Sequence, residues 1–241
     1  RAWMRSPNLN HGLVIKAAGQ IAVQYQFASS EYWIDSSKRP RLQLHMASTT
    51  ATPVPTETPR EATPTATSTG VPTPSATPTA EATPYRFKLA LQQGLGDYEG
   101  VEDTYLDAWS QTARMGQDGS LRVRRGGVRS ALLRYDLEHL PAKARLARAE
   151  LKLWTAAASN RGDLGLCAYE MLSPWEENLA SWLSSSKGRP WWAPGANGLG
   201  EDRDGDVVAE ILLSEDEQWV SMDVTEIVRE WLEHPEDKHG L

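Results

Sequence analysis

Short stretches in which apolar and polar residues alternate recur along most of the chain. In residues 21–27, Ile21, Val23, Tyr25 and Phe27 fall on one face at a period of two, as a half-buried strand requires. The same reasoning predicts strands at residues 13–19, 20–29, 41–46, 131–137, 149–154, 164–170, 206–213 and 218–224. Gly19-Gln20 predicts a turn that pairs the first two strands as a hairpin.

One segment has a helical period instead. Val224, Ile227, Val228 and Trp231 share a face at helical spacing, so residues 224–234 predict a short helix. Asp223, with Glu226 three residues later, resembles a capping box. Together with the many short strands, this pattern predicts an all-β fold, a jelly-roll-like antiparallel β-sandwich with one short helix.

The pattern is interrupted by a Thr/Pro-rich segment that contains no aromatic residue, Leu, Ile or Met. It cannot bury enough apolar surface to fold, so we expect a disordered linker at residues 47–84. A glycosylated mucin-like stalk and an unmodified spacer both fit this composition. The linker divides the chain into residues 1–46 and residues 85–241, of which the first is too short for an independent core.

Residues 1–13 and residues 229–241 carry nearly the same phrase and share six identical positions, Arg, Trp, Pro, His, Gly and Leu. We therefore expect residues 1–46 to be the closing strands of a preceding or permuted sandwich, and residues 85–241 to be a second sandwich without its last strands. Residues 14–46 would then complete it in cis, or in trans by strand addition.

Within the phrase we expect structural roles. We expect Trp231 and its counterpart Trp3 to pack in the core. We expect the matching Gly12 and Gly240 to adopt a backbone conformation that other residues resist. His11 and His239 lack a second His or Cys at ligand spacing, which disfavours a metal site there.

Composition restricts the function. A pI of about 5.3 and a net charge of −7 argue against nucleic acid as a partner, and no apolar stretch is long enough for a membrane span. The single cysteine, Cys167, lies in an alternating run and predicts a buried strand residue rather than a reactive thiol. No nucleophile–base motif is recognisable, so we expect a protein that is not an enzyme.

Two groups of residues are candidates for ligand binding. Trp191 and Trp192 stand in a Gly/Pro-rich loop and could stack on sugar rings, or anchor the loop by packing inward. Arg122 and Arg124 would share one face of a strand and could bind carboxylates of an acidic polysaccharide. Alternatively, they form a solvated face or pair with the many acidic residues of the chain.

A structural calcium ion is the one cofactor that the sequence suggests. Asp202, Asp204 and Asp206 are close in sequence and offer the oxygen ligands that calcium prefers. The position of Gly205 departs from the EF-hand order, and a solvated acidic turn is the alternative.

The ordered motifs "EDTYLDAW", "RSALLRYDLEHLPAKARLARAELKLW", "WAPGANGLGEDRDGD" and "DVTEIVREWL" resemble DNRLRE-domain proteins of the carbohydrate-binding module family 96 type. The resemblance covers residues 85–241 and implies a non-catalytic module of a secreted or cell-surface bacterial tandem-repeat protein. Its expected partners are polysaccharide and neighbouring repeats. The alternative is a structural spacer or adhesin-stalk domain without a ligand.

Overall fold

The computed structural model describes residues 10–19, 22–48, 85–138, 140, 144–160 and 162–233. These residues form the predicted all-β fold with one short α-helix. The strands are β1 (Leu13–Ala18), β2 (Gln24–Ala28), β3 (Arg41–Ser48), β4 (Tyr85–Gln92), β5 (Val101–Asp107), β6 (Ser120–Arg124), β7 (Arg129–Tyr135), β8 (Ala144–Ala158), β9 (Leu164–Glu170), β10 (Ser184–Ser186), β11 (Arg189–Pro190), β12 (Ala209–Leu213) and β13 (Gln218–Asp223). The helices are α1 (Thr225–Glu233) and the 3₁₀ turns η2 (Ser36–Lys38) and η3 (Arg125–Gly127).

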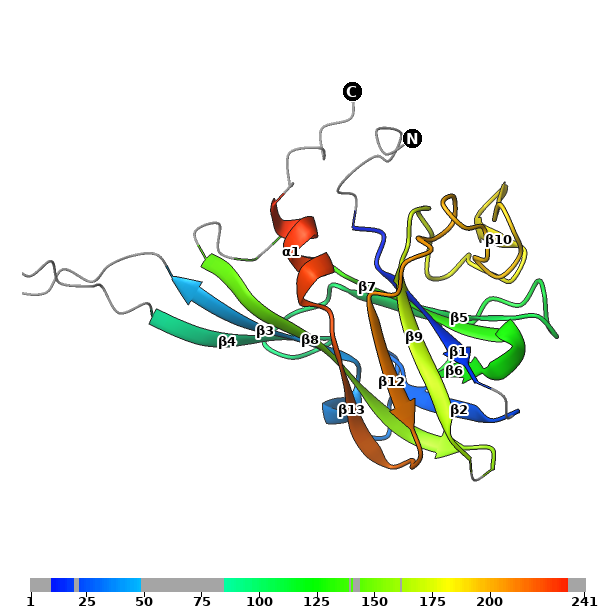
Figure 1. Ribbon diagram of the computed structural model, residues 1–241, viewed down its shortest axis with the longest axis horizontal. Helices are drawn as coiled ribbons and strands as arrows, with labels where there is room; N and C mark the ends of the chain where they lie inside the picture. Colours follow the sequence, from blue (N-terminus) through cyan, green and yellow to red (C-terminus); the bar gives the residue numbers. More distant parts are fainter. Residues whose placement is uncertain are drawn as a thin grey trace, which may run out of the picture.

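Eleven of the described strands form one antiparallel sheet. Its order is β12-β9-β1-β7-β6-β2-β8-β3-β4, with β13 also paired to β8 and β5 to β7. The sheet curls (Figure 1). Side chains of β1, β7 and β9 therefore share a core with those of β2, β3 and β8. The resulting sandwich-like fold agrees with the predicted fold class.

Strands from both sides of the Thr/Pro-rich segment are interleaved in this sheet. β1 lies between β7 and β9, β2 between β6 and β8, and β3 between β4 and β8. Ser48 at the end of β3 is the register partner of Tyr85 at the start of β4. The early strands therefore pair with the later ones within the same chain. Most of the predicted linker, residues 49–84, lies outside the described residues.

The predicted hairpin between the first two strands is wrong. β1 and β2 occupy separate places in the sheet, each between strands from after residue 85. Both edges of β1 are occupied, by β7 and β9, so β2 cannot pair with it. Consecutive residues Val14 and Ile15 are both fully buried, as in a strand that is covered on both faces.

Helix α1 closes one end of the core. Val224 at its start joins Ile227, Val228 and Trp231 in the main apolar cluster, as the helical pattern predicts. Asp223 caps the helix by accepting hydrogen bonds from the backbone N–H (3.0 Å) and the hydroxyl of Thr225. The predictions for Trp3, His239 and Gly240 fall outside the described residues. Within the described part of the chain, no helix is both long and apolar enough to cross a bilayer.

A second apolar cluster lies on the other face of β1, β5 and β7. Val14, Leu106 and Leu132 of these strands pack against Trp175 and Trp191 from the segment that connects β9 to β12. That segment, residues 171–208, is named here the cover loop. It carries most of the candidate residues that the sequence suggests.

Candidate functional site

Lys16 holds the cover loop onto the sheet. Its ammonium is buried and donates hydrogen bonds to the Ser130 hydroxyl (3.2 Å), the Gly195 carbonyl (2.9 Å) and Asn197 Oδ1 (3.0 Å). Burial, assisted by the charge of Arg203, lowers the pKa of Lys16 to about 7. The three acceptors belong to β7 and to the cover loop, so Lys16 holds the cover loop against the sheet.

Two of the predicted calcium ligands, Asp202 and Asp204, accept backbone hydrogen bonds within the cover loop. The Asp202 carboxylate is buried and accepts backbone N–H bonds from Trp192 (2.8 Å), Ala193 (3.0 Å) and Gly198 (2.9 Å). Asp204 accepts the N–H of Asp206 at 3.1 Å. Among the described residues, these three aspartates do not gather as a set of potential metal ligands. The Asp202 carboxylate instead satisfies backbone N–H donors inside the cover loop.

The two adjacent tryptophans point in opposite directions. Trp191 is 4% exposed, and its indole N–H donates to the Ser181 carbonyl at 2.8 Å. It packs in the second apolar cluster, which is the anchoring alternative considered for this loop. Trp192 is 76% exposed, so of the pair it alone offers an aromatic face to a ligand.

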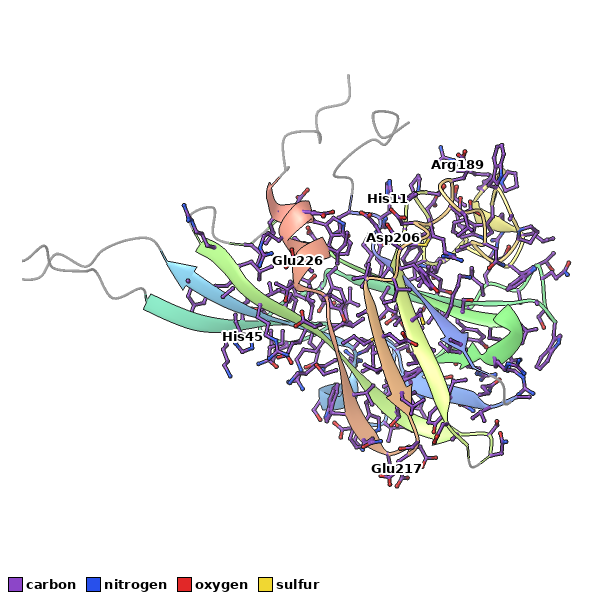
Figure 2. All side chains as sticks on the ribbon, viewed as in Figure 1. His11, His45, Arg189, Asp206, Glu217 and Glu226 are labelled. Atoms are coloured by element: carbon purple, nitrogen blue, oxygen red, sulfur yellow. The ribbon has the colours of Figure 1, made fainter. Side chains whose placement is uncertain are left out.

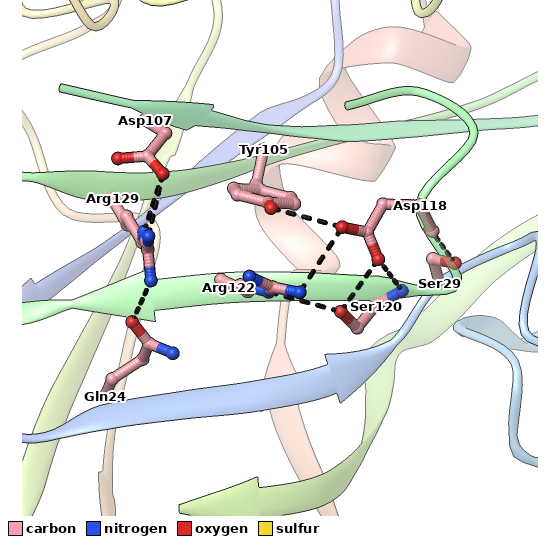
Figure 3. Close-up of polar contacts among 8 residues, drawn as sticks. All are labelled: Gln24, Ser29, Tyr105, Asp107, Asp118, Ser120, Arg122 and Arg129. Atoms are coloured by element: carbon pink, nitrogen blue, oxygen red, sulfur yellow. Dashed lines mark hydrogen bonds and ion pairs between the residues drawn. The ribbon is translucent and has the colours of Figure 1, made fainter. Parts of the chain in front are cut away.

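The arginines of β6 lie on one face of that strand, alternating with buried Leu121 and Val123. The Arg122 guanidinium lies 3.5 Å from the Asp118 carboxylate and 5.3 Å from the centre of the Tyr105 ring (Figure 3). Tyr105 in turn donates its hydroxyl to Asp118 at 3.1 Å. Arg122 is therefore engaged within the protein, as one of the alternatives predicts.

The structure adds a tryptophan that sequence reasoning missed. Trp109 is 61% exposed, and the guanidinium groups of Arg124 and Arg129 lie 5.2 and 4.8 Å from the centre of its ring. Arg129 is fixed by a 2.8 Å ion pair with Asp107 and by a hydrogen bond to Gln24 (Figure 3). Arg124 has no carboxylate within 4.0 Å among the described residues.

The loop of Trp109 is joined to the loop of Trp192. The Leu183 N–H donates to the Gln111 carbonyl at 3.3 Å, and the Trp191 N–H donates to the Leu183 carbonyl at 3.2 Å. Two exposed indoles thus stand on loops that are hydrogen-bonded to each other. We name Trp109, Arg124 and Arg129 the Trp109 surface. Its sequence signal is a tryptophan two residues after the end of a strand.

A cleft of about 650 Å³ opens near the start of β1 and helix α1. Its charged lining is predominantly acidic, with Glu99, Glu102, Asp136 and Glu138 against Arg134. His11, which also lines it, is labelled in Figure 2. Burial and the nearby charges of Arg134 and Arg189 lower the pKa of His11 to about 4. Arg134 is paired with Glu102. This cleft disfavours anionic ligands, in contrast to the Trp109 surface.

Comparison with known proteins gives one family. Residues 102–241 match the model of the TGF-beta propeptide family, and the chain belongs to that family. A search of curated proteins and a search of solved structures each return no match.

This match overturns the DNRLRE resemblance and the keywords that followed from it: membership of a carbohydrate-binding module family, a tandem repeat and a bacterial source. TGF-beta propeptides occur in secreted proteins, in agreement with the predicted secretion.

Proposed function

We propose that this member of the TGF-beta propeptide family is a non-catalytic binding module of a secreted protein, which recognises an acidic polysaccharide at the Trp109 surface. The observation that carries the proposal is the exposed indole of Trp109 with two guanidinium groups beside its ring. Indole planes stack on sugar rings, and guanidinium forks match carboxylates. Because Asp107 is paired with Arg129, the Arg124 guanidinium is the group of this surface that lies within 4.0 Å of no described carboxylate.

Affinity electrophoresis of the full chain in gels with polygalacturonate, alginate or neutral dextran tests this function. We expect retardation by the two acidic polymers and none by dextran. Trp109→Ala and Arg124→Gln should each weaken binding at least about tenfold, the size of a lost stacking or charged contact of about 1.4 kcal/mol. Trp33→Ala, at a tryptophan that is 83% exposed but outside the surface, is the matched control. Absence of retardation, or equal loss in the control, would contradict the proposal.

A second candidate is a structural role in association with another protein chain. It is favoured by β12, which pairs with β9 on one side, ends the sheet order and carries Leu212 at 68% exposure. Exposed sheet edges with apolar side chains accept an added strand. In that case Leu212→Lys, and not Trp109→Ala, would abolish association of the full chain measured by light scattering.

A further inference from the structure

Three carboxylates from distant parts of the chain meet at the free edge of β5. Glu31 follows β2, Asp103 lies in β5, and Glu177 belongs to the cover loop. Each brings one oxygen to within 4.8 Å of the other two. Such proximity of like charges is unfavourable in water and more so in a protein interior, so it requires a compensating charge.

Asp103 is the central member and lacks that compensation. Its side chain is 1% exposed; Oδ2 accepts the Ser30 N–H at 2.7 Å, while Oδ1 is buried without a hydrogen-bond partner. No described Lys or Arg nitrogen lies within 4.0 Å of any of the three carboxylates. A buried carboxylate oxygen with neither donor nor cation is costly.

The groups around Asp103 are held in place by the backbone. Glu177 Oε1 accepts the N–H of Asp103 at 2.9 Å, and the Ser30 hydroxyl contacts the Glu31 carboxylate at 2.8 Å. Gly116 packs closely against the backbone of Glu177, since a Cβ added at Gly116 would lie 2.4 Å from the Glu177 carbonyl oxygen. The cluster is therefore built into the fold rather than formed by flexible surface side chains.

We propose that Glu31, Asp103 and Glu177 form a binding site for a calcium-sized divalent cation that ties β5 to the loop after β2 and to the cover loop. Three oxygens no more than 4.8 Å apart can all lie within about 2.8 Å of one point, close to calcium–oxygen distances and longer than those of magnesium. Burial and the neighbouring carboxylates raise the pKa of Asp103, and burial raises that of Glu177 to about 7. Both pKa values are raised, as expected for crowded carboxylates whose negative charge lacks a compensating cation.

Calorimetric titration of CaCl₂ into the chelator-treated full chain tests the site. We expect one site with a dissociation constant of about 10⁻⁴–10⁻³ M, as in extracellular calcium modules, and weaker binding of Mg²⁺. Millimolar Ca²⁺ should raise the melting temperature at pH 7.5 relative to EGTA. Glu177→Gln should weaken calcium binding at least tenfold, whereas the adjacent exposed Glu176→Gln should leave it unchanged.

Asp103→Asn separates binding from folding. It removes the central charge at nearly constant volume, so it should lose the calcium response while melting in EGTA at the same temperature as the wild type or higher. Absence of a calcium-binding heat in the wild type would overturn the proposal, as would equal calcium affinity of Glu177→Gln and wild type. A third result would also overturn it: the wild type shows no response to Ca²⁺ and has a higher melting temperature at pH 6 than at pH 7.5. A shared proton would then hold the carboxylates together.

Discussion

Gly12 shows at the scale of one residue why part of the repeated phrase is structural. Its φ is +82°, and a Cβ there would lie 2.1 Å from the carbonyl oxygen of Leu133. We expect Gly12→Ala to reduce the free energy of unfolding by more than about 2 kcal/mol, because backbone strain adds to a clash with a paired strand. Urea denaturation measures the loss. Gly126→Ala is the matched control, since Gly126 has the same φ but open space around its Cβ position; equal losses would refute the clash.

His11 gives the chain a pH dependence below neutrality. Its folded pKa of about 4 lies below the ordinary value of 6.5, so the unfolded chain binds more protons between these two values. Stability should therefore be complete above pH 6.5 and fall as the pH decreases towards 4. Denaturation between pH 4.5 and 7.5 should show a smaller slope for His11→Gln than for wild type. An NMR titration of His11 with a midpoint near 6.5 would disprove this.

Individual side chains mark the limit of prediction from the sequence. The burial of Cys167 and Trp231 follows from local periodicity and is confirmed at 5% and 8% exposure. The direction of Trp191 depends on contacts with Val14 and Leu132, far away in sequence, and no local pattern encodes them. The same holds for Glu31, Asp103 and Glu177, which meet only because the sheet brings their segments together.

At the scale of elements, the periodic segments were predictable and their partners were not. The pattern places strands at residues 41–46, 164–170 and 218–224, where β3, β9 and β13 lie, and the helix at α1. Period and capping are local properties, so one sequence suffices for them. Pairing is not local, and the expected hairpin is wrong because β1 pairs with β7 and β9 instead of β2.

The buried ammonium of Lys16 is one of the contacts that hold the cover loop against the sheet. Lys16→Met removes three hydrogen bonds and leaves the Gly195 carbonyl and Asn197 Oδ1 without their donor. We expect hydrogen exchange of the Trp192, Ala193 and Gly198 amides to accelerate at least tenfold, while β2 and β8 stay protected. Lys88→Met, at an exposed position of β4, is the control. Uniform acceleration across the whole sheet would argue against a local clamp.

At the scale of the whole molecule, the interleaved sheet changes the meaning of the Thr/Pro-rich segment. Residues 49–84 join β3 to β4, which are direct neighbours, and the residues on either side of the segment, Ser48 and Tyr85, are paired. The segment therefore leaves and re-enters the sheet at one place. Its composition was readable from the sequence, but the position of its two ends required knowledge of the pairing.

Replacement of residues 49–84 by a two-residue Asn-Gly turn should stabilise the protein. Paired flanking residues are the geometry that such a turn closes, and a shorter flexible loop costs less entropy to close. We expect the free energy of unfolding to rise by about 1–3 kcal/mol, measured by urea denaturation. Doubling the segment with Gly-Ser repeats should cost only about 0.6 kcal/mol.

The mass of the shortened protein in solution decides whether β1, β2 and β3 pair within one chain. With pairing in cis, light scattering should give a monomer as stable as or more stable than the parent. If these strands paired between chains instead, a two-residue connection could not span two molecules, and the shortened protein would unfold or assemble differently from the parent. A shortened variant that is monomeric and stabilised therefore supports a single self-completed sandwich, in which the early strands are part of the same folding unit as residues 85–233.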